Sequence, residues 1–199
     1  MRAALTRSPH RLFPGFLGDE LAAAILAHAL SNQARMKPTK VGFGDQIRRD
    51  ESIRSSIVLR DLGPFLAPVM ERVDACEPEL LHALGMRPFT RSHVQVELVA
   101  HGDGGFYRRH IDTATGSGNQ KQPRRLTMVW YAHQRPKAFS GGALRLHALM
   151  GDAFTDIEPA HDLMVAFPSW MPHEVMPVSV PGGRLEDSRF AMNIWLCGS

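Results

Sequence analysis

Cysteine is scarce in this chain, with two residues among 199. Cys76 and Cys197 lie far apart and form no CxxC pair, so the sequence carries neither a disulfide framework nor a cysteine-based zinc site. Both cysteines are therefore expected to be free thiols in a reducing compartment. This expectation favours a cytoplasmic protein, and a reducing compartment also suits ferrous iron.

Long apolar runs are lacking as well. The run at residues 22–30 contains His28 and is far shorter than the ~20 residues that a membrane-spanning helix needs. The first 13 residues interrupt their apolar side chains with arginine and proline, so they contain no signal-peptide core. We therefore expect no membrane partner.

A strong charge of one sign is also absent, since the net charge is +3. Residues 1–60 hold ten Lys/Arg against five Asp/Glu, but these basic residues are sparse and no aromatic residues alternate with them. A nucleic-acid partner is therefore not expected. The 44% apolar and 22% charged residues are typical of a globular protein, and the length suits one domain.

The first 90 residues are mainly helical in pattern. A helix is expected from Asp19, as its N-cap, to about residue 31, and a strand at 53–60. Two further helices are expected at 64–76 and 78–84, each opened by a proline. The polar segment 33–51 is typical of a loop or ragged hairpin, and its length makes it a candidate lid.

After Pro88 the pattern changes from helical to β. Short segments rich in β-branched residues recur between turns that contain glycine and proline. The expected strands are 92–99, 126–131, 143–147, 163–167, 174–178 and 190–196. Many short strands at such spacing indicate a sandwich or barrel. The sequence thus predicts an α+β, mainly β fold, with helical support in residues 1–90 and a β-barrel core in 91–199.

The triplet His110-Ile111-Asp112 is the first candidate metal site. In an extended strand, residues two apart point to the same side, so an imidazole and a carboxylate would face one point. The triplet follows a glycine-rich turn at 102–105, and His173 stands just before a later predicted strand. Two histidines and one carboxylate form the facial triad of non-heme Fe(II) oxygenases.

Other interpretations of these residues remain open at this point. Two histidines and a carboxylate also bind zinc, so a zinc hydrolase or a barrel that binds a ligand without catalysis is an alternative. Histidines in the helical front portion are expected to be surface or packing residues, whereas three later ones are candidate ligands by residue type alone. The first group is His10, His28 and His82, and the second is His133, His147 and His161.

The segment SRFAMNIWL indicates an anion site. In a strand, Arg189, Ala191, Asn193 and Trp195 share one face, and the four intervening apolar residues share the other. An arginine on an inward face is costly unless it meets an anion, so Arg189 predicts a carboxylate in the pocket. The alternative is an arginine paired with Glu186 or Asp187 at a strand edge.

Five ordered motifs resemble those of the Fe(II)- and 2-oxoglutarate-dependent dioxygenases, in particular the branch of prolyl 4-hydroxylases. They are HGDGGFYRRHID, RRLTMVWY, GGALRL, AFPSWMPHEVMPV and SRFAMNIWL, and the resemblance runs from about residue 91 to residue 196. The resemblance implies a double-stranded β-helix of the jelly-roll or cupin type. It also implies Fe(II), 2-oxoglutarate and O2 as cofactors and co-substrates, with ascorbate as a stimulant.

The resemblance implies a role for each matching residue. His110, Asp112 and His173 would bind iron, while Arg189 and Tyr131 would hold the distal carboxylate of 2-oxoglutarate. The other expected pocket residues are Leu144, Val175, Asn193 and Trp195, with Tyr107 near the mouth. His101 departs from the family, because many relatives have a tyrosine there that contacts 2-oxoglutarate. The spacing from His173 to Arg189 is also long, which leaves Arg184 as an alternative anchor.

The resemblance further implies hydroxylation of an unactivated C–H bond. Related halogenases replace the carboxylate ligand, so the presence of Asp112 favours a hydroxylase. The expected substrate is a prolyl or other residue in a peptide or protein. The alternative is a free amino acid or a small natural-product intermediate. Repair of alkylated nucleic acid is disfavoured, because Arg184 and Arg189 lack the paired spacing of that group. A monomer or homodimer is expected.

Overall fold

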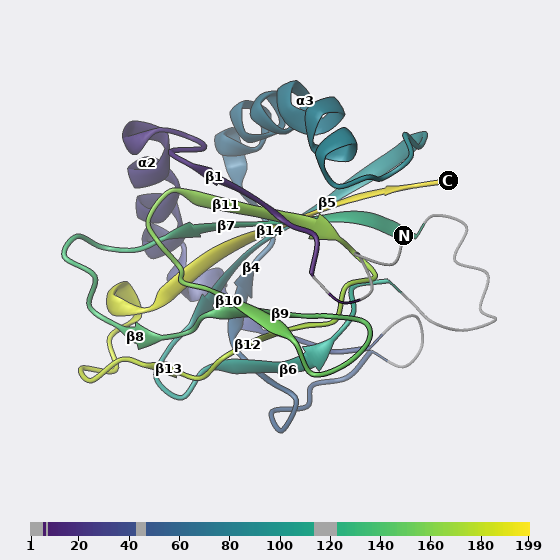
Figure 1. Cartoon of the computed structure of the whole chain (residues 1–199). Helices are drawn as coiled ribbons and strands as arrows, with labels where there is room; N and C mark the ends of the chain where they lie inside the picture. Colours follow the sequence, from purple (N-terminus) through teal and green to yellow (C-terminus); the bar gives the residue numbers. More distant parts are fainter. Residues whose placement is uncertain (1–5, 7, 43–46, 114–122) are drawn as a thin grey trace.

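The computed structural model describes residue 6 and residues 8–42, 47–113 and 123–199 of the chain. Two β-sheets lie one over the other, and two helices cover the outer face of the larger sheet (Figure 1). The α+β, mainly β architecture predicted from the sequence is thereby confirmed. The helices among the described residues include none long and apolar enough to cross a membrane.

The larger sheet has seven strands in the order β1-β11-β7-β14-β5-β4-β2. Their bounds in that order are β1 Arg11–Pro14, β11 Leu163–Pro168, β7 Arg124–Ala132, β14 Arg189–Gly198, β5 Arg91–His101, β4 Ile57–Leu59 and β2 Lys37–Pro38. The central strand β14 pairs antiparallel with β5 on one side and β7 on the other. The last strand of the chain therefore holds the middle of the sheet together.

The smaller sheet has five strands in the order β10-β9-β12-β6-β3. Their bounds are β10 Phe154–Ile157, β9 Leu144–His147, β12 His173–Val175, β6 Phe106–His110 and β3 Arg54–Ser55. A further two-stranded sheet pairs β8 Ser140–Gly141 with β13 Val178–Ser179. Short 3-10 turns lie at Gln33–Arg35, Gly63–Phe65 and Leu185–Asp187.

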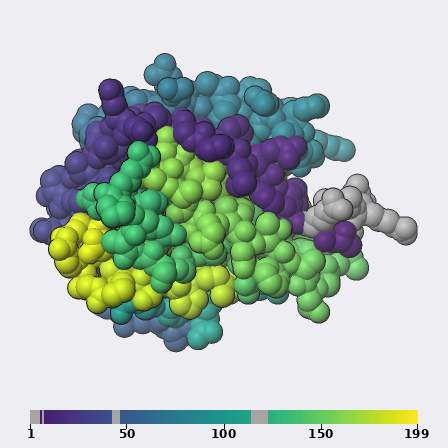
Figure 2. Space-filling model, turned by 60° about the vertical axis from the view of Figure 1, so that its left-hand side comes forward, coloured from purple at the N-terminus to yellow at the C-terminus, as the bar shows by residue number. Residues whose placement is uncertain are grey.

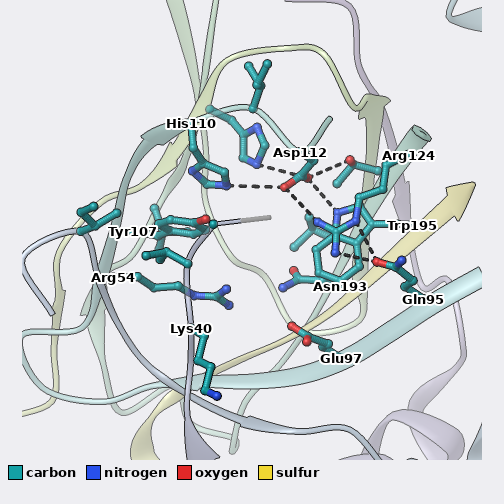
Figure 3. A pocket seen from close by; sticks show the side chains of 18 of the residues that line it. Lys40, Arg54, Gln95, Glu97, Tyr107, His110, Asp112, Arg124, Asn193 and Trp195 are labelled. Carbon is teal, nitrogen blue, oxygen red and sulfur yellow. Dashed lines mark hydrogen bonds and ion pairs between the residues drawn. The ribbon is translucent and has the colours of Figure 1, made fainter. Parts of the chain in front are cut away.

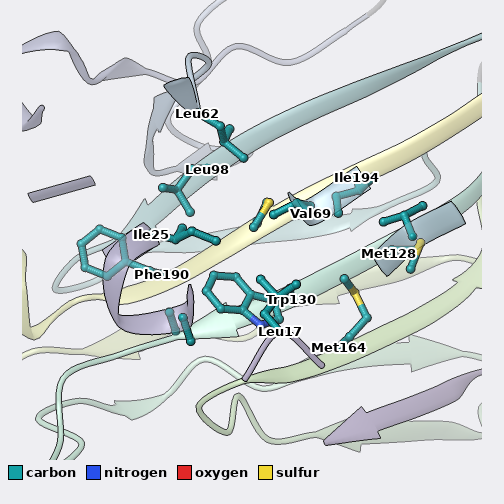
Figure 4. Close-up of a cluster of buried hydrophobic side chains, with 14 of the residues drawn as sticks. Leu17, Ile25, Leu62, Val69, Leu98, Met128, Trp130, Met164, Phe190 and Ile194 are labelled. Atoms are coloured by element: carbon teal, nitrogen blue, oxygen red, sulfur yellow. The ribbon is translucent and has the colours of Figure 1, made fainter. Parts of the chain in front are cut away.

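The helices α2 (Asp19–Ser31) and α3 (Leu66–Ala83) bury one stripe each against the larger sheet. Their buried residues recur at helical spacing, as an amphipathic helix requires; they are Ala22, Ile25, Leu26 and Ala29 in α2 and Val69, Val73, Leu80 and Leu81 in α3. These side chains meet Trp130, Phe190 and Ile194 of the sheet (Figure 4). A second apolar cluster, which includes Val129, Leu146 and Phe167, fills the space between the two main sheets.

The start of α2 is capped by a residue from a distant loop. Gly18 precedes the helix with a positive φ of 86° and makes no side-chain cap. Instead, the buried carboxylate of Asp162 accepts hydrogen bonds from the backbone N–H groups of Leu17 and Gly18 at 2.9 and 2.8 Å. The same carboxylate accepts a hydrogen bond from Trp130 Nε1 at 2.7 Å. Asp162 thus ties the helix to β7 of the sheet.

The expected α2 is confirmed, but Asp19 is its first helical residue rather than its N-cap. The two helices expected at 64–76 and 78–84 are wrong, because α3 is one helix with Pro78 inside it. The rule that proline ends a helix is overridden here, since the helix buries Val69 and Val73 before the proline and Leu80 and Leu81 after it.

The strand expected at 53–60 is two strands that belong to different sheets, β3 and β4. The strand expected at 174–178 is likewise split between β12 and β13. The five other expected strands of residues 91–199 are confirmed with shifts of a few residues, while β1, β2, β6, β8 and β10 were not among the expected strands. Figure 2 shows the unpredicted N-terminal strand region lying between α3 and the region of β11, with which β1 pairs.

Candidate active site

The smaller sheet brings the three predicted metal ligands together. His110 ends β6, and His173 lies opposite it as the first residue of β12. Asp112 lies just beyond β6, so the two residues do not share one strand as the alternation argument assumed. The bend still aims both side chains at one point, since one ligand atom from each of the three residues lies within 4.8 Å of the others. The structure describes no other such cluster.

Hydrogen bonds orient the two imidazoles. His110 Nδ1 lies 2.8 Å from the carbonyl oxygen of Arg108, and His173 Nδ1 lies 2.9 Å from that of Met171. Each Nδ1–H donates to its carbonyl, which leaves Nε2 with a free lone pair. The Nε2 atoms lie 3.6 and 3.5 Å from the carboxylate oxygens of Asp112. Both rings therefore present the nitrogen that a divalent metal binds.

The carboxylate of Asp112 is buried and held from behind. Its Oδ2 accepts hydrogen bonds from Thr127 Oγ1 and Trp195 Nε1, each at 2.9 Å. Burial alone would raise the pKa of Asp112, but His173, His110 and Arg124 outweigh it and hold the pKa far below its usual value. Burial, together with the charge of His110, lowers the pKa of His173 to about 4. At neutral pH the site thus offers a carboxylate and a neutral imidazole, as metal binding needs.

Arg124 forms an outer layer of this site that the sequence argument missed. Its guanidinium stacks on the Trp195 ring, 3.7 Å from the ring centroid, and donates two hydrogen bonds to Gln95 Oε1 at 2.9 and 2.6 Å. Arg124 Nη1 also lies 3.9 Å from Asp112 Oδ1 (Figure 3). Arg124 therefore fixes Trp195, which in turn fixes the carboxylate.

Arg189 lies at the other end of the cavity and is 1% exposed. Its Nε donates to the carbonyl oxygen of Gly142 at 2.7 Å, and its Nη1 lies 3.4 Å from His101 Nδ1. Gly142 has a φ of +72°, and a Cβ there would lie 2.6 Å from Arg189 Cδ, so only glycine fits this close approach. Arg184 lies elsewhere, exposed and paired with Glu186 and Asp187 at 2.9 and 3.2 Å.

Three buried polar atoms around Arg189 have no hydrogen-bond partner among the described residues. They are Arg189 Nη2, Tyr131 Oη and His101 Nε2. Burial raises the pKa of Tyr131 to about 12, so its hydroxyl stays protonated. Burial and the charges of Arg189 and Arg54 hold the pKa of His101 well below its usual value, so its imidazole is neutral. Unsatisfied buried groups are costly, and a carboxylate placed among these atoms would satisfy them.

One cavity of about 560 Å³ joins the metal site to Arg189. Ten of the eleven residues singled out from the sequence line it, and the eleventh, Tyr131, is fully buried. The lining residues among them are His101, Tyr107, His110, Asp112, Leu144, His173, Val175, Arg189, Asn193 and Trp195. The described part of segment 33–51 also reaches the cavity through Lys40, Val41, Gly42, Ile47 and Arg48; its residues 43–46 lie outside the described residues.

Residues 95–197 match the family model of the 2OG-Fe(II) oxygenase superfamily, which is more than half of the chain. The chain belongs to this superfamily. It is 37% identical over 191 residues to an uncharacterized PKHD-type hydroxylase of Synechocystis, an alignment that covers 91% of this chain and 60% of that protein. It is also 34% identical over 99 residues to human Egl nine homolog 1, covering 47% of this chain and 20% of that protein.

The solved structures similar to this superfamily member include prolyl hydroxylases. A Pseudomonas putida prolyl-4-hydroxylase aligns over 100% of both chains, with a TM-score of 0.70 and 22% identity. A Trichoplax adhaerens prolyl hydroxylase covers 98% of this chain and 86% of its own, with a TM-score of 0.67 and 20% identity. These likenesses confirm the predicted jelly-roll fold. The superfamily uses Fe(II), 2-oxoglutarate and O2, which confirms the predicted cofactors.

Proposed function

We propose that this chain is a hydroxylase that uses Fe(II), 2-oxoglutarate and O2 to oxidise a C–H bond of a prolyl or other residue in a peptide or protein. The observation that carries the proposal is the pairing of two features in one cavity. A His-Asp-His cluster lies at one end, and an unsatisfied Arg189, Tyr131 and His101 lie at the other. A zinc hydrolase would have no use for the second of these features, and a simple binding barrel would not need the two together.

The residues present fit the cofactors of the family. His110, Asp112 and His173 would hold Fe(II), because two neutral imidazoles and one carboxylate are the donor set of a facial triad. Arg189 and Tyr131 would hold the distal carboxylate of 2-oxoglutarate, in preference to the exposed Arg184. When bound, Fe(II), 2-oxoglutarate and O2 would supply the oxidation. The 2-oxoglutarate and O2 yield succinate and CO2, and one oxygen atom is inserted into the substrate C–H bond.

The chain's own side chains position the reactants and limit water. The neutral Tyr131 hydroxyl would donate a hydrogen bond to the distal carboxylate of 2-oxoglutarate, while Arg189 would supply the charge and is held by the carbonyl of Gly142. Leu144, Val175 and Trp195 give the cavity apolar walls near the metal ligands. Excluding water in this way protects a strong oxidant from side reactions. Asn193 offers a polar group on the same inward face of β14.

A peptide or protein substrate is supported by the relatives, which include prolyl hydroxylases by name. The Trichoplax structure was obtained with a peptide fragment of hypoxia-inducible factor. We also propose that residues 1–199 act as a single oxygenase domain, since β2 and β4 of the front portion join the same sheet as β5 and β14. Lid movement of segment 33–51, stimulation by ascorbate and a monomeric or dimeric state stay predictions.

The proposal is tested first without turnover. Anaerobic addition of Fe(II) and 2-oxoglutarate should produce a weak visible charge-transfer band, and folded protein without this band would contradict the assignment. Asp112→Ala should then lower the rate of succinate formation in air by at least 100-fold relative to the wild-type protein. Normal succinate formation by the variant would remove Asp112 from the metal site. Mass spectrometry for +16 products across peptides and free amino acids then separates the two substrate classes.

A further inference from the structure

Arg54 is a second deeply buried arginine in the cavity, and the proposed chemistry does not use it. It lies on β3, which pairs with β6 so that Arg54 is opposite Tyr107, and it is 8% exposed. Its guanidinium carbon lies 4.6 Å from the centroid of the Tyr107 ring. The other side of that ring stacks on His110, with centroids 3.5 Å apart and planes at 20° (Figure 3). Arg54 is therefore one ring away from a proposed metal ligand.

Three other lining arginines have carboxylate neighbours. Arg48 pairs with Asp50 at 3.3 Å and Arg60 with Glu97 at 3.0 Å, while Arg124 lies 3.9 Å from Asp112. Within the described ranges, only Arg54 and Arg189 line the cavity as buried arginines with no carboxylate oxygen within 4 Å. A buried cation without a close counter-ion is unfavourable, so an anion bound beside either of the two would be stabilising.

Arg54 is free to bind one. Its only side-chain hydrogen bond to a described residue runs from Nε to Ser56 Oγ at 3.0 Å, so the two terminal nitrogens still have donors to offer. A guanidinium with both terminal N–H groups available matches a carboxylate in two-point geometry. Lys40 lines the same cavity and adds positive charge without a described carboxylate partner.

The anion for Arg54 is not supplied by 2-oxoglutarate if that molecule binds as proposed. One of its two carboxylates would bind the metal together with the keto group, and the other would meet Arg189. We propose that Arg54 binds a carboxylate of the substrate itself, so that the enzyme selects an acidic residue beside the oxidised one. This inference rests on the proposed function, because it needs both ends of 2-oxoglutarate to be engaged elsewhere.

The stacking limits how far the acidic group is from the oxidised carbon. The guanidinium and the His110 imidazole are separated by a single aromatic ring. An extended chain advances ~3.5 Å per residue, so a carboxylate at Arg54 lies within about two residues of the residue at the metal. The expected substrate class is thus a peptide with Asp or Glu adjacent to the oxidised residue.

The test measures binding, because the natural substrate is unidentified. Acetyl-Ala-Glu-Pro-Ala-amide and acetyl-Ala-Pro-Glu-Ala-amide are titrated by calorimetry into the full chain with Fe(II) and saturating 2-oxoglutarate, without oxygen. The matched probes have Gln in place of Glu. At least one acidic peptide should bind about tenfold or more tightly than its Gln partner, as expected for a charge-assisted hydrogen bond.

Variants then assign the preference to one side chain. Arg54→Gln should abolish it, and Arg54→Lys, which keeps the charge without the two-point geometry, should retain part of it. Arg48→Gln is the matched control, because Arg48 lines the same cavity but already has Asp50 as a partner. It should keep the full preference. The charge-transfer band with 2-oxoglutarate reports that each variant is folded.

Two outcomes overturn the proposal while leaving the proposed function intact. One is a wild-type protein that shows the band but binds Glu and Gln peptides equally, or neither. The other is an Arg54→Gln variant that needs much more 2-oxoglutarate to form the band, which would assign Arg54 to the co-substrate. If the wild-type protein forms no band at all, the proposed function itself fails, and this inference fails with it.

Discussion

The two faces of β14 differ in character, because alternate residues of this one strand pack into the apolar core on one side and line the cavity on the other. The outward face carries Phe190, Met192, Ile194 and Leu196, each at most 1% exposed and packed in the cluster beneath the helices. The inward face carries Arg189, Asn193 and Trp195, which line the cavity. The first face is satisfied by apolar neighbours alone. The second contains the buried charge of Arg189, whose Nη2 has no partner among the described residues and would be satisfied by a bound anion.

This difference separates stability from activity along a single element. Apolar contacts on the outward face are complete in the chain as it stands, so their loss should lower the free energy of unfolding. Polar groups on the inward face are incomplete without a ligand, so their loss should mainly weaken binding. Buried polar groups of this kind are characteristic of functional sites, where local rules of stability are violated.

Ile194→Ala is the largest expected effect and tests the outward face. Ile194 is fully buried and faces Met128 and Val96 across the neighbouring strands, so truncation leaves a cavity. We expect a loss of about 3 kcal/mol in the free energy of unfolding, measured by urea denaturation. Asn193→Ala, the adjacent residue on the other face, is the control and should lose about 1 kcal/mol or less. Equal losses would erase the distinction between the faces.

Arg189→Gln tests the inward face. Removing the charge should raise the 2-oxoglutarate concentration needed for half-maximal succinate formation by about 100-fold, because a two-point charged contact is lost. Arg184→Gln should change it less than about twofold, because Arg184 is exposed and paired with its own neighbours. Titrations of the charge-transfer band check both values. A strong effect of Arg184→Gln with none from Arg189→Gln would reverse the assignment.

Trp195→Phe tests the part of the same face that lies beside the proposed metal ligands. The change removes the hydrogen bond from Nε1 to Asp112 Oδ2 but keeps an aromatic ring for Arg124 to stack on. We expect metal affinity to fall about tenfold, as for other groups that orient a metal ligand. Competition with a metal chelator measures it. An unchanged affinity would show that Thr127 alone holds the carboxylate.

His101→Asn carries the smallest expected effect and concerns pH. Burial, Arg189 and Arg54 lower the pKa of His101 in the folded chain, whereas the unfolded chain takes up a proton near pH 6.5. The unfolded state thus binds more protons below that pH, and stability falls as the pH drops through it. His101→Asn should reduce this loss by about 1 kcal/mol between pH 7 and pH 5, measured by denaturation at both values. Identical pH slopes would contradict a neutral, buried His101.

Much of the β14 site could be predicted from the sequence because strand alternation is a strict rule. The two-residue alternation of side chains along a strand predicts one shared face for Arg189, Asn193 and Trp195, and in the structure all three line the cavity. The proposed iron ligands follow from residue type and position, and the structure brings them together, although the strand argument for Asp112 was wrong in detail. Pro88 correctly marked the change from helical to β structure.

The missed residues share a physical reason. Arg54 lies in the segment expected as a strand at 53–60, but no local pattern there distinguishes a buried arginine from the exposed ones around it. Its burial depends on pairing between β3 and β6, which are about 50 residues apart in the chain. Thr127 and Arg124 support Asp112 through contacts that the sequence does not encode locally. The single helix α3 was missed because burial on both sides of Pro78 overrides a local signal.

The central place of β14 also has a consequence for how the molecule is made. Its partners β5 and β7 precede it, and the pair Arg189 and His101 is separated by 88 residues. Contacts this distant form slowly, because a long loop must close before they are gained. During synthesis, the edges of β5 and β7 that pair with β14 therefore stay unpaired until the ten residues of β14 have left the ribosome. Until then His110 and His173 exist in the chain, but the cavity between them and Arg189 does not.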